Sequence, residues 1–408
     1  MKILYLVHQF FPQFQAGTEK FIFNIASMAQ QTGNIVKIVS YDCEAGGNFT
    51  SDAFGVRSKQ FSYQGLPVLA FQYKNEPPDL HYTMDEALGV QFAKHVLERE
   101  APDLIHVGHL MRVYPIVLAA IEMGIPYVLT LTDFHLICPK ILLMPTSDTL
   151  CTGPEGGEAC AKFCSELPSS FIKQRLALAA KILKNAKQVV APSKFVAEVF
   201  QREIPGIKVI VNSHGVKQTK LRPNEKIYGD EDEITFGFIG NQTVHKGPHL
   251  LVKAFSEMNH PRSRLLIYGT GRPEFVSKLH QLAGNSNIEF RGSFRPESLP
   301  DVLREFDVFV NPALCYETYS FVNHEALSNE IPVICSKLGG MFEKIVEGKN
   351  GYTFPAGDGE ALKDILSSVV EHPAQLNAMK KYICLETLIP TVEQEAYRYD
   401  QIYKSIFR

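Results

Sequence analysis

Short apolar runs separated by amphipathic stretches recur along most of the chain. In the first half, apolar runs typical of buried strands cover residues 2–8, 35–41, 68–71, 104–107, 127–131, 188–191 and 208–211. Stretches with apolar residues at helical spacing lie between several of these runs. The first is residues 18–31, and Gly33 terminates this predicted helix. Strands that alternate with helices predict a parallel, doubly wound sheet.

The same alternation starts again after a polar segment at residues 217–233. The second set of buried-type strands covers residues 234–239, 265–268, 288–291, 308–310 and 332–335. We therefore expect two domains of similar architecture, an N-terminal domain at 1–222 and a C-terminal domain at 233–390. Helical spacing in residues 391–408 predicts a terminal helix, which either returns to the N-terminal domain or packs on its own domain.

Composition limits the class of protein. The 408 residues carry 41 Lys and Arg against 44 Asp and Glu, and this net charge of −3 argues against a nucleic-acid-binding protein, which needs a basic excess. No apolar run approaches the roughly 20 residues of a membrane-spanning helix, and the run at residues 2–8 is too short for a signal peptide. The sequence thus predicts a cytoplasmic protein whose 8 cysteines are mostly reduced.

Two carboxylates follow the strand predicted at residues 308–310. Glu317 is expected in a loop, and Glu325, eight positions later, in the first turns of the next helix. Ligands of open α/β sheets bind at this end of the strands, so both side chains could reach one ligand. By itself the spacing favours a simpler explanation, a loop acid and a solvated first-turn glutamate stabilised by the helix dipole.

The surrounding segments change that balance. Residues 234–247 form a buried-type strand followed by a polar loop with Gly240 and Lys246, and residues 339–358 carry an ordered set of glycines. Together with the two glutamates, these blocks resemble the nucleotide-sugar half of the retaining glycosyltransferases of family 4. The resemblance covers most of residues 233–360 and extends more loosely over the N-terminal half.

This resemblance implies the GT-B fold, in which two Rossmann-like, doubly wound domains face a central cleft. It implies retaining transfer of a hexose from a UDP- or GDP-sugar, held by the C-terminal domain, to a sugar or lipid-linked glycan acceptor, held by the N-terminal domain. Such reactions build surface polysaccharides and glycolipids, and no metal is implied for the phosphates. Two alternatives stay open: a sugar-nucleotide epimerase on the same architecture, and a non-catalytic nucleotide- or sugar-binding protein.

The resemblance also implies roles for individual residues. Lys246 would meet the diphosphate as a point charge, Glu325 would accept hydrogen bonds from the ribose hydroxyls, and Glu317 would face the reacting sugar. Asn241 stands where family members usually have a basic residue, so one phosphate charge is missing or comes from elsewhere. The other expected donor-binding residues are Gly17, Gly240, Arg291, Gly292, Phe294, Thr318, Tyr319, Ser320 and Phe321. Of these, Ser320 replaces the usual glycine.

In the N-terminal half, candidate catalytic residues follow two predicted strands. His109 comes after the strand at residues 104–107, and Asp133 after the strand at 127–131. Thr132 stands where many family members have histidine, and a threonine cannot shuttle a proton as histidine can. Asp133 and His135 are therefore the candidates for that role.

Four cysteines cluster after these residues in a glycine-rich segment at 138–164: Cys138, Cys151, Cys160 and Cys164. Four thiols in a segment that lacks an apolar core of its own favour a closed tetrathiolate site, and zinc suits such a site. The spacing matches no common zinc finger. Free thiols, two disulfides and an iron–sulfur centre therefore stay open as alternatives.

Residues 169–188 combine an apolar stripe with a basic face. The segment from 168 to 197 has no acidic residue, and its basic residues are Lys173, Arg175, Lys181, Lys184, Lys187 and Lys194. Such a segment suits a peripheral contact with the anionic inner face of a membrane. A core helix with a solvated basic face explains the pattern equally well.

Overall fold

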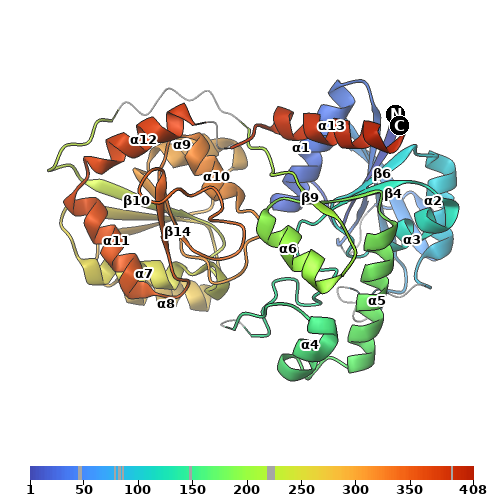
Figure 1. The fold of residues 1–408 in the computed structure, drawn as a ribbon, viewed down its shortest axis with the longest axis horizontal. Helices are drawn as coiled ribbons and strands as arrows, with labels where there is room; N and C mark the ends of the chain where they lie inside the picture. The colour runs from blue at the N-terminus through green and yellow to red at the C-terminus, as the bar shows by residue number, and fades with distance from the viewer. Residues whose placement is uncertain are drawn as a thin grey trace. The chain divides into compact units, whose positions relative to one another are not determined.

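The computed structural model describes residues 1–44, 48–77, 80, 84, 87–146, 149–217, 226–386 and 389–408. The chain divides into two compact units (Figure 1). Unit 1 comprises Met1–Pro145, Leu150–His214 and Val392–Arg408, and unit 2 comprises Thr146–Thr149 and Gly215–Thr391. The domain end expected at residue 222 lies outside the described residues.

Unit 1 is built on a nine-stranded sheet in the order β3-β4-β5-β2-β1-β6-β7-β8-β9. The strands are β1 (Lys2–Val7), β2 (Ile35–Tyr41), β3 (Ser51–Ala53), β4 (Val56–Tyr63), β5 (Leu66–Tyr73), β6 (Leu104–Val107), β7 (Tyr127–Thr130), β8 (Gln188–Ala191) and β9 (Val209–Val211). Neighbours pair in parallel, except that β4 is antiparallel to both β3 and β5. The sequence did not predict β3 and β4, because only Val56 of their residues is buried and no apolar run marks them.

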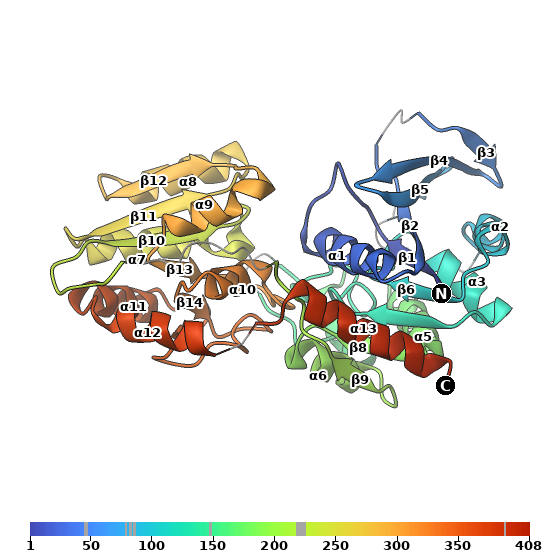
Figure 2. The ribbon, with the colours of Figure 1, turned by 90° about the horizontal axis from the view of Figure 1, so that it is seen from above.

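The helices of unit 1 are α1 (Gly17–Gln31), α2 (Val90–Glu100), α3 (Tyr114–Met123), α4 (Glu158–Phe163), α5 (Ser169–Asn185), α6 (Lys194–Glu203) and α13 (Val392–Ile406). The C-terminal helix α13 packs against α1, and the two helices lie side by side in both ribbon views (Figures 1 and 2). Tyr399 and Tyr403 are buried, and their hydroxyls lie 2.9 Å from Thr130 Oγ1 and 2.5 Å from His106 Nδ1. Apolar burial and polar contacts thus join the C-terminus to the first sheet.

Unit 2 is built on a six-stranded parallel sheet in the order β12-β11-β10-β13-β14-β15. The strands are β10 (Ile234–Ile239), β11 (Ser263–Tyr268), β12 (Ile288–Gly292), β13 (Val308–Asn311), β14 (Val333–Ser336) and β15 (Gly351–Phe354). The helices are α7 (Pro248–Met258), α8 (Pro273–Ala283), α9 (Leu299–Arg304), α10 (Phe321–Ser328), α11 (Gly359–Glu371) and α12 (Gln375–Leu385). Buried residues of α7, α8 and α11 share one core cluster, and those of α9 and α10 share another.

Both sheets change the direction of their strand order at one point. In unit 1 the change lies between β1 and β6, and in unit 2 it lies between β10 and β13. Loops that leave neighbouring strands in opposite directions open a crevice at the carboxyl ends of those strands. Each unit therefore offers one preferred position for a ligand.

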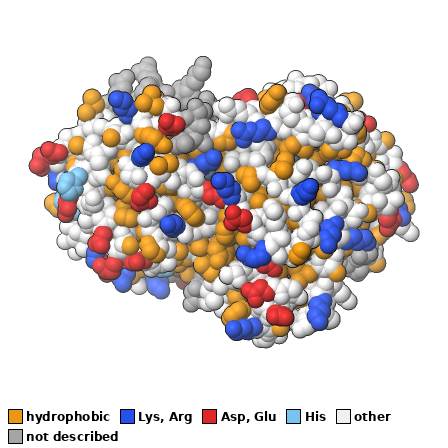
Figure 3. Space-filling view, viewed as in Figure 1, with side chains coloured by type: hydrophobic (Ala, Val, Ile, Leu, Met, Phe, Trp, Pro, Cys, Tyr) orange, Lys and Arg blue, Asp and Glu red, His pale blue; other side chains and the backbone are white. Residues whose placement is uncertain are grey.

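The surface charges and the packing of helix α5 are relevant to the expected contact with an anionic membrane. Basic and acidic side chains are interspersed on the face shown in Figure 3. Helix α5 buries its apolar stripe, at Ile172, Leu178, Ala179, Ile182 and Leu183, together with Arg175. This packing favours the core-helix explanation of residues 169–188. Within the described parts of the chain, no helix combines the length and apolar character needed to cross a membrane.

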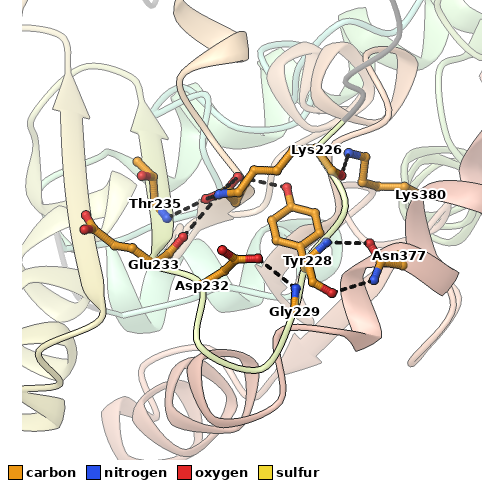
Figure 4. Close-up of polar contacts among 9 residues, drawn as sticks. Lys226, Tyr228, Gly229, Asp232, Glu233, Thr235, Asn377 and Lys380 are labelled. Carbon is orange, nitrogen blue, oxygen red and sulfur yellow. Dashed lines mark hydrogen bonds and ion pairs between the residues drawn. The ribbon is translucent and has the colours of Figure 1, made fainter.

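The segment that enters β10 is fixed to unit 2 by a buried carboxylate. Asp307 accepts hydrogen bonds from Lys226 Nζ at 2.8 and 2.9 Å, from the Tyr228 hydroxyl at 2.8 Å and from the Thr235 N–H at 2.8 Å. Asn377 bonds both the N–H and the carbonyl of Tyr228 at 2.9 Å (Figure 4). The polar composition that indicated a domain boundary therefore serves, over residues 226–235, to fix the segment that leads into β10.

Candidate functional site

The loops after β10 and β13 bring a lysine and a glutamate together. Lys246 ends a short 3-10 turn after β10, and its Nζ forms an ion pair with Glu317 Oε1 from the loop after β13. Their side chains are 31% and 16% exposed, so a ligand can still reach them. Burial disfavours the charge on Lys246, but the charge of Glu317, the nearby Cys315 and the hydrogen bond to Glu317 together raise the pKa of Lys246 above its usual value. Lys246 is thus held in its charged form.

A close backbone contact joins these two loops beside Lys246. Gly247 has a φ of 71°, and a Cβ there would lie 2.0 Å from the carbonyl oxygen of Pro312. On the other side of Lys246, the N–H of Leu314 donates to the carbonyl of His245 at 2.8 Å. A glycine is therefore required at 247, because any side chain would push the lysine loop away from the glutamate loop.

Helix α10 begins where the sequence placed the phosphate-binding backbone. Ser320 has φ 64° and ψ 81°, a left-handed conformation that explains why family members usually have glycine there. Asn311, the last residue of β13, donates to Ser320 Oγ at 3.0 Å and to Asn323 Oδ1 at 2.8 Å. The Tyr319 ring stacks on His324 with centroids 3.9 Å apart. These contacts fix the first turn of α10, which begins at Phe321, and Thr318 lies in the loop before it.

Glu325 lies in α10 and is only 7% exposed. It lies on the helix that follows the Glu317 loop, so β13 positions both glutamates. The structure thus places the two carboxylates on one strand–loop–helix unit.

The turn expected to bind the nucleotide base lies at the end of β12, which is two strands away from β10 in the sheet. The Arg291 guanidinium pairs with Glu289 at 2.9 Å and with Glu305 at 3.9 Å. Gly292 has a φ of 71°, and its carbonyl accepts the N–H of Gly269 at 2.7 Å. Phe294 packs edge-on against Tyr268. Because these side chains have partners within the unit, the backbone of this turn is what a base would meet.

Gly240 and Asn241 follow β10 directly. Gly269 approaches Gly240 so closely that a Cβ on Gly269 would lie 1.9 Å from the Gly240 carbonyl oxygen. Asn241 is exposed, so its amide is available to a ligand but supplies no charge.

In unit 1, His109 follows β6 and Asp133 follows β7, and the two side chains meet. His109 Nε2 lies 2.5 Å from Asp133 Oδ2, and the N–H of Met111 donates to His109 Nδ1 at 3.1 Å. Because Nδ1 accepts a hydrogen bond, the proton of a neutral imidazole lies on Nε2 and is donated to Asp133. The Asp133 side chain is 24% exposed and that of His109 3%, so Asp133 is the member that a ligand can reach.

A histidine and a glutamate that sequence reasoning did not place in the site lie behind this pair. The His8 ring packs on His109 with centroids 4.0 Å apart, and His8 Nε2 lies 3.5 Å from Oε1 of the fully buried Glu19. Burial lowers the pKa of His8 well below its usual value and raises the pKa of Glu19. The sequence signal for Glu19 was its position as an acid in the first turn of α1. It lies two residues after Gly17, where that helix begins at the switch point.

The other residues of the β7 loop are held inside the unit. His135 is 2% exposed, and its carbonyl accepts from Arg175 of α5. Burial lowers the pKa of His135 well below its usual value. The Thr132 hydroxyl donates to the Gly108 carbonyl at 2.8 Å, which fixes the loop that carries His109.

The four clustered cysteines lie farther along the β7 loop and around α4. Cys138, Cys151, Cys160 and Cys164 are free thiols that line one cavity of about 20 Å³. Helix α4 was not predicted, and it places Cys160 and Cys164 one turn apart. Among the described residues, no three His, Cys, Asp or Glu side chains are placed to hold a metal ion.

Comparison with known proteins gives two family matches. Residues 16–219, half of the chain, match the family described as Glycosyltransferase Family 4. Residues 233–372 match the family described as Glycosyl transferases group 1.

Individual relatives are more distant. Spore coat protein SA of Bacillus subtilis is 32% identical over 146 residues, covering 32% of this chain and 39% of that protein. D-inositol 3-phosphate glycosyltransferase of Corynebacterium urealyticum is 28% identical over 181 residues, covering 42% of each. These matches span less than half the length of either relative.

The fold has full-length counterparts among solved structures. The Anabaena protein HepE, solved in complex with UDP, superimposes with a TM-score of 0.70 at 18% identity, covering 99% of this chain and 100% of that one. The predicted fold class, GT-B with two Rossmann-like domains, is confirmed by this likeness and by the two parallel sheets.

Proposed function

Because the chain belongs to glycosyltransferase family 4, we propose that it is a retaining enzyme that transfers a hexose from a UDP- or GDP-sugar to a sugar or lipid-linked glycan. The observation that carries this proposal is the Lys246–Glu317 pair at the switch point between β10 and β13. A cation suited to a diphosphate and a carboxylate suited to a sugar are there in direct contact. The complex of HepE with UDP supports a nucleotide-sugar donor.

In this proposal, unit 2 holds the donor. Lys246 and the N-terminal turn of α10 stabilise the negative charge that develops on the leaving diphosphate. Glu325 accepts hydrogen bonds from the ribose hydroxyls, and the backbone around Gly292 meets the base. Glu317 faces the hexose. When the donor binds, the ion pair between Glu317 and Lys246 opens, Glu317 contacts the sugar and Lys246 contacts the phosphates. Sugar binding is thereby coupled to phosphate binding.

Unit 1 would hold the acceptor. Asp133 accepts a hydrogen bond from the acceptor hydroxyl, while His109 holds the carboxylate in place through its Nε2 proton. The hydroxyl attacks the anomeric carbon on the face that the diphosphate leaves, and a departing phosphate oxygen takes the hydroxyl proton. The new glycosidic bond then keeps the configuration of the donor.

The test is incubation of the protein with a panel of UDP- and GDP-sugars, with and without candidate glycan acceptors. We expect nucleotide release that depends on one donor and is accelerated by one acceptor, with a product of retained anomeric configuration by NMR. An epimerised sugar nucleotide without nucleotide release would indicate the epimerase. Tight nucleotide binding without turnover on any donor would indicate a binding protein.

Replacing Lys246 with alanine should weaken binding of the nucleoside diphosphate about 10- to 100-fold, since a hydrogen bond to a charged group contributes roughly 1.5–3 kcal/mol. The loss includes repulsion from Glu317, which would face the phosphates without its partner. The nucleoside alone should bind as before. Calorimetry with UDP, GDP and the matching nucleosides measures the difference. Lys253→Ala, on an exposed lysine of α7, is the matched control. Equal weakening of nucleoside and diphosphate would show that Lys246 only supports the loop.

Replacing Glu325 with alanine should weaken the nucleoside and the diphosphate equally, because the ribose is common to both. We expect a roughly tenfold rise in Kd, the effect of losing a hydrogen bond to a carboxylate. Glu297→Ala, on an exposed glutamate of the same unit, controls for the change of charge. A 2′-deoxynucleotide should bind wild type and the Glu325 variant with similar Kd values. Unchanged affinity for the ribonucleotide would place the ribose contact elsewhere.

A further inference from the structure

The four clustered cysteines come from separate segments of unit 1 and meet at one cavity. Cys138 lies in the β7 loop, Cys151 in an extended stretch before α4, Cys160 within α4 and Cys164 at its end. The cavity of about 20 Å³ has room for one small ion or water, and its other lining side chains are mainly apolar. The thiols thus provide nearly all the polar groups that an occupant would meet.

Two basic side chains lie beside the cluster. Lys140 lines the cavity, and its ammonium pairs with Glu166 at 2.6 Å. Arg175 holds the turn before Cys138 through the His135 carbonyl. Cations near metal-bound sulfurs offset part of the negative charge that the sulfurs carry.

The backbone that brings the thiols together is held in unfavourable conformations. Ile141 and Leu143 have φ values of 68° and 53°, in the left-handed region that bulky side chains rarely adopt. Glu155 has a φ of 51°, beside Gly156 and Gly157, which also have positive φ. Such conformations cost free energy and persist only where another interaction determines them. The N–H of Cys151 donates to the Leu143 carbonyl at 2.8 Å, and the N–H of Glu155 donates to Glu203 Oε2 at 2.9 Å. These bonds hold part of the loop, and a metal ion would add a link between its segments.

We propose that Cys138, Cys151, Cys160 and Cys164 bind one structural zinc ion. Binding replaces four S–H bonds by four Zn–S bonds and releases four protons, without any change of oxidation state. Among the described residues no three such side chains are placed to hold a metal ion, so zinc binding would require rotation of the cysteine side chains toward the cavity. The free energy of binding compensates for the unfavourable turn conformations.

The zinc site would position the acceptor residues. The N–H of Cys138 donates to the Phe134 carbonyl at 2.8 Å, and the N–H of His135 donates to Asp133 Oδ1 at 2.8 Å. One continuous turn therefore connects the first zinc ligand to the carboxylate that meets His109. Helix α4 packs against α5 (Figure 1). Arg175 of α5 holds the same turn through the His135 carbonyl. Zinc loss should loosen this turn and leave the sheet of unit 2 unchanged.

The experiment is elemental analysis of the full chain purified without chelator. We expect one zinc per chain, and cobalt taken up in its place should give the intense visible spectrum of a tetrahedral thiolate site. Cys160→Ser should lose the metal, whereas Cys384→Ser, at an exposed cysteine outside the cluster, should keep it. If Cys160→Ser does not fold, release of one zinc from wild type by a thiol-blocking reagent, followed with a metallochromic dye, gives the same information.

Four outcomes would overturn the proposal. They are a metal-free folded protein with four titratable thiols in residues 138–164, disulfides between these cysteines, bound iron with inorganic sulfide, and zinc that remains in Cys160→Ser. Nucleotide binding by unit 2 should be the same with and without zinc. The zinc proposal and the proposed donor chemistry can therefore fail separately.

Discussion

Replacing Glu317 with alanine is expected to lower turnover about 10²–10³-fold, the typical cost of removing one well-placed group that stabilises charge in the transition state. The stability of unit 2 should change far less. The pair with Lys246 is partly exposed, and such pairs contribute roughly 0.2–1 kcal/mol. Steady-state kinetics with saturating donor and acceptor, together with thermal unfolding, measures both effects.

The same variant also tests whether Glu317 competes with the donor for Lys246. Without Glu317 the ammonium is free for the phosphates, so the Kd for the nucleoside diphosphate should stay equal or fall while turnover drops. Glu371→Ala, on an exposed glutamate at the end of α11, should leave both quantities unchanged. Near wild-type turnover in Glu317→Ala would remove this residue from the reaction centre.

Asp133→Asn should lower the rate of transfer about 10- to 100-fold, because a hydrogen bond to a charged group contributes roughly 1.5–3 kcal/mol. The amide keeps the size of the carboxylate but has lost its charge, so it holds the acceptor hydroxyl poorly. Donor affinity should not change, and slow hydrolysis of the donor by water should fall less than transfer. Rates of transfer and of hydrolysis, measured in parallel, separate these effects.

A variant of His109 provides a second test of the proposed role of Asp133. If it acts by holding Asp133, the double variant His109→Ala/Asp133→Asn should be no slower than Asp133→Asn alone, because the two residues act as one unit. Asp364→Asn, on an exposed aspartate of α11, is the matched control. Additive losses in the double variant would instead show that His109 contacts the substrate by itself.

Apolar periodicity was a sound guide to the buried strands. The predicted strands at residues 35–41, 104–107, 188–191 and 234–239 coincide with β2, β6, β8 and β10. Strands in a sheet covered on both faces are continuous apolar runs, and such runs are visible without any tertiary information. Strands β3, β4 and β15 were not predicted, because they are short or half-exposed and carry no such run.

The sequence identified candidate residues wherever they follow a buried strand. Lys246, Glu317, His109 and Asp133 were singled out because parallel strands present their carboxyl ends at one edge of the sheet. Their roles remain predictions. Sequence reasoning did not place Glu19 beside His8, because that contact joins the end of β1 to the first turn of α1 across a loop.

The sequence by itself determined the class of fold, the repeated alternation of strand and helix, and the residue types at the strand ends, because these depend on local periodicity. Only the tertiary structure decided which of those side chains meet. Lys246 contacts Glu317 because β10 and β13 are neighbours although 71 positions separate the two residues. The C-terminal helix belongs to unit 1 because Tyr399 and Tyr403 find partners there in β6 and β7. Strand order and side-chain burial are cooperative properties of the whole chain, and no local window of sequence contains them.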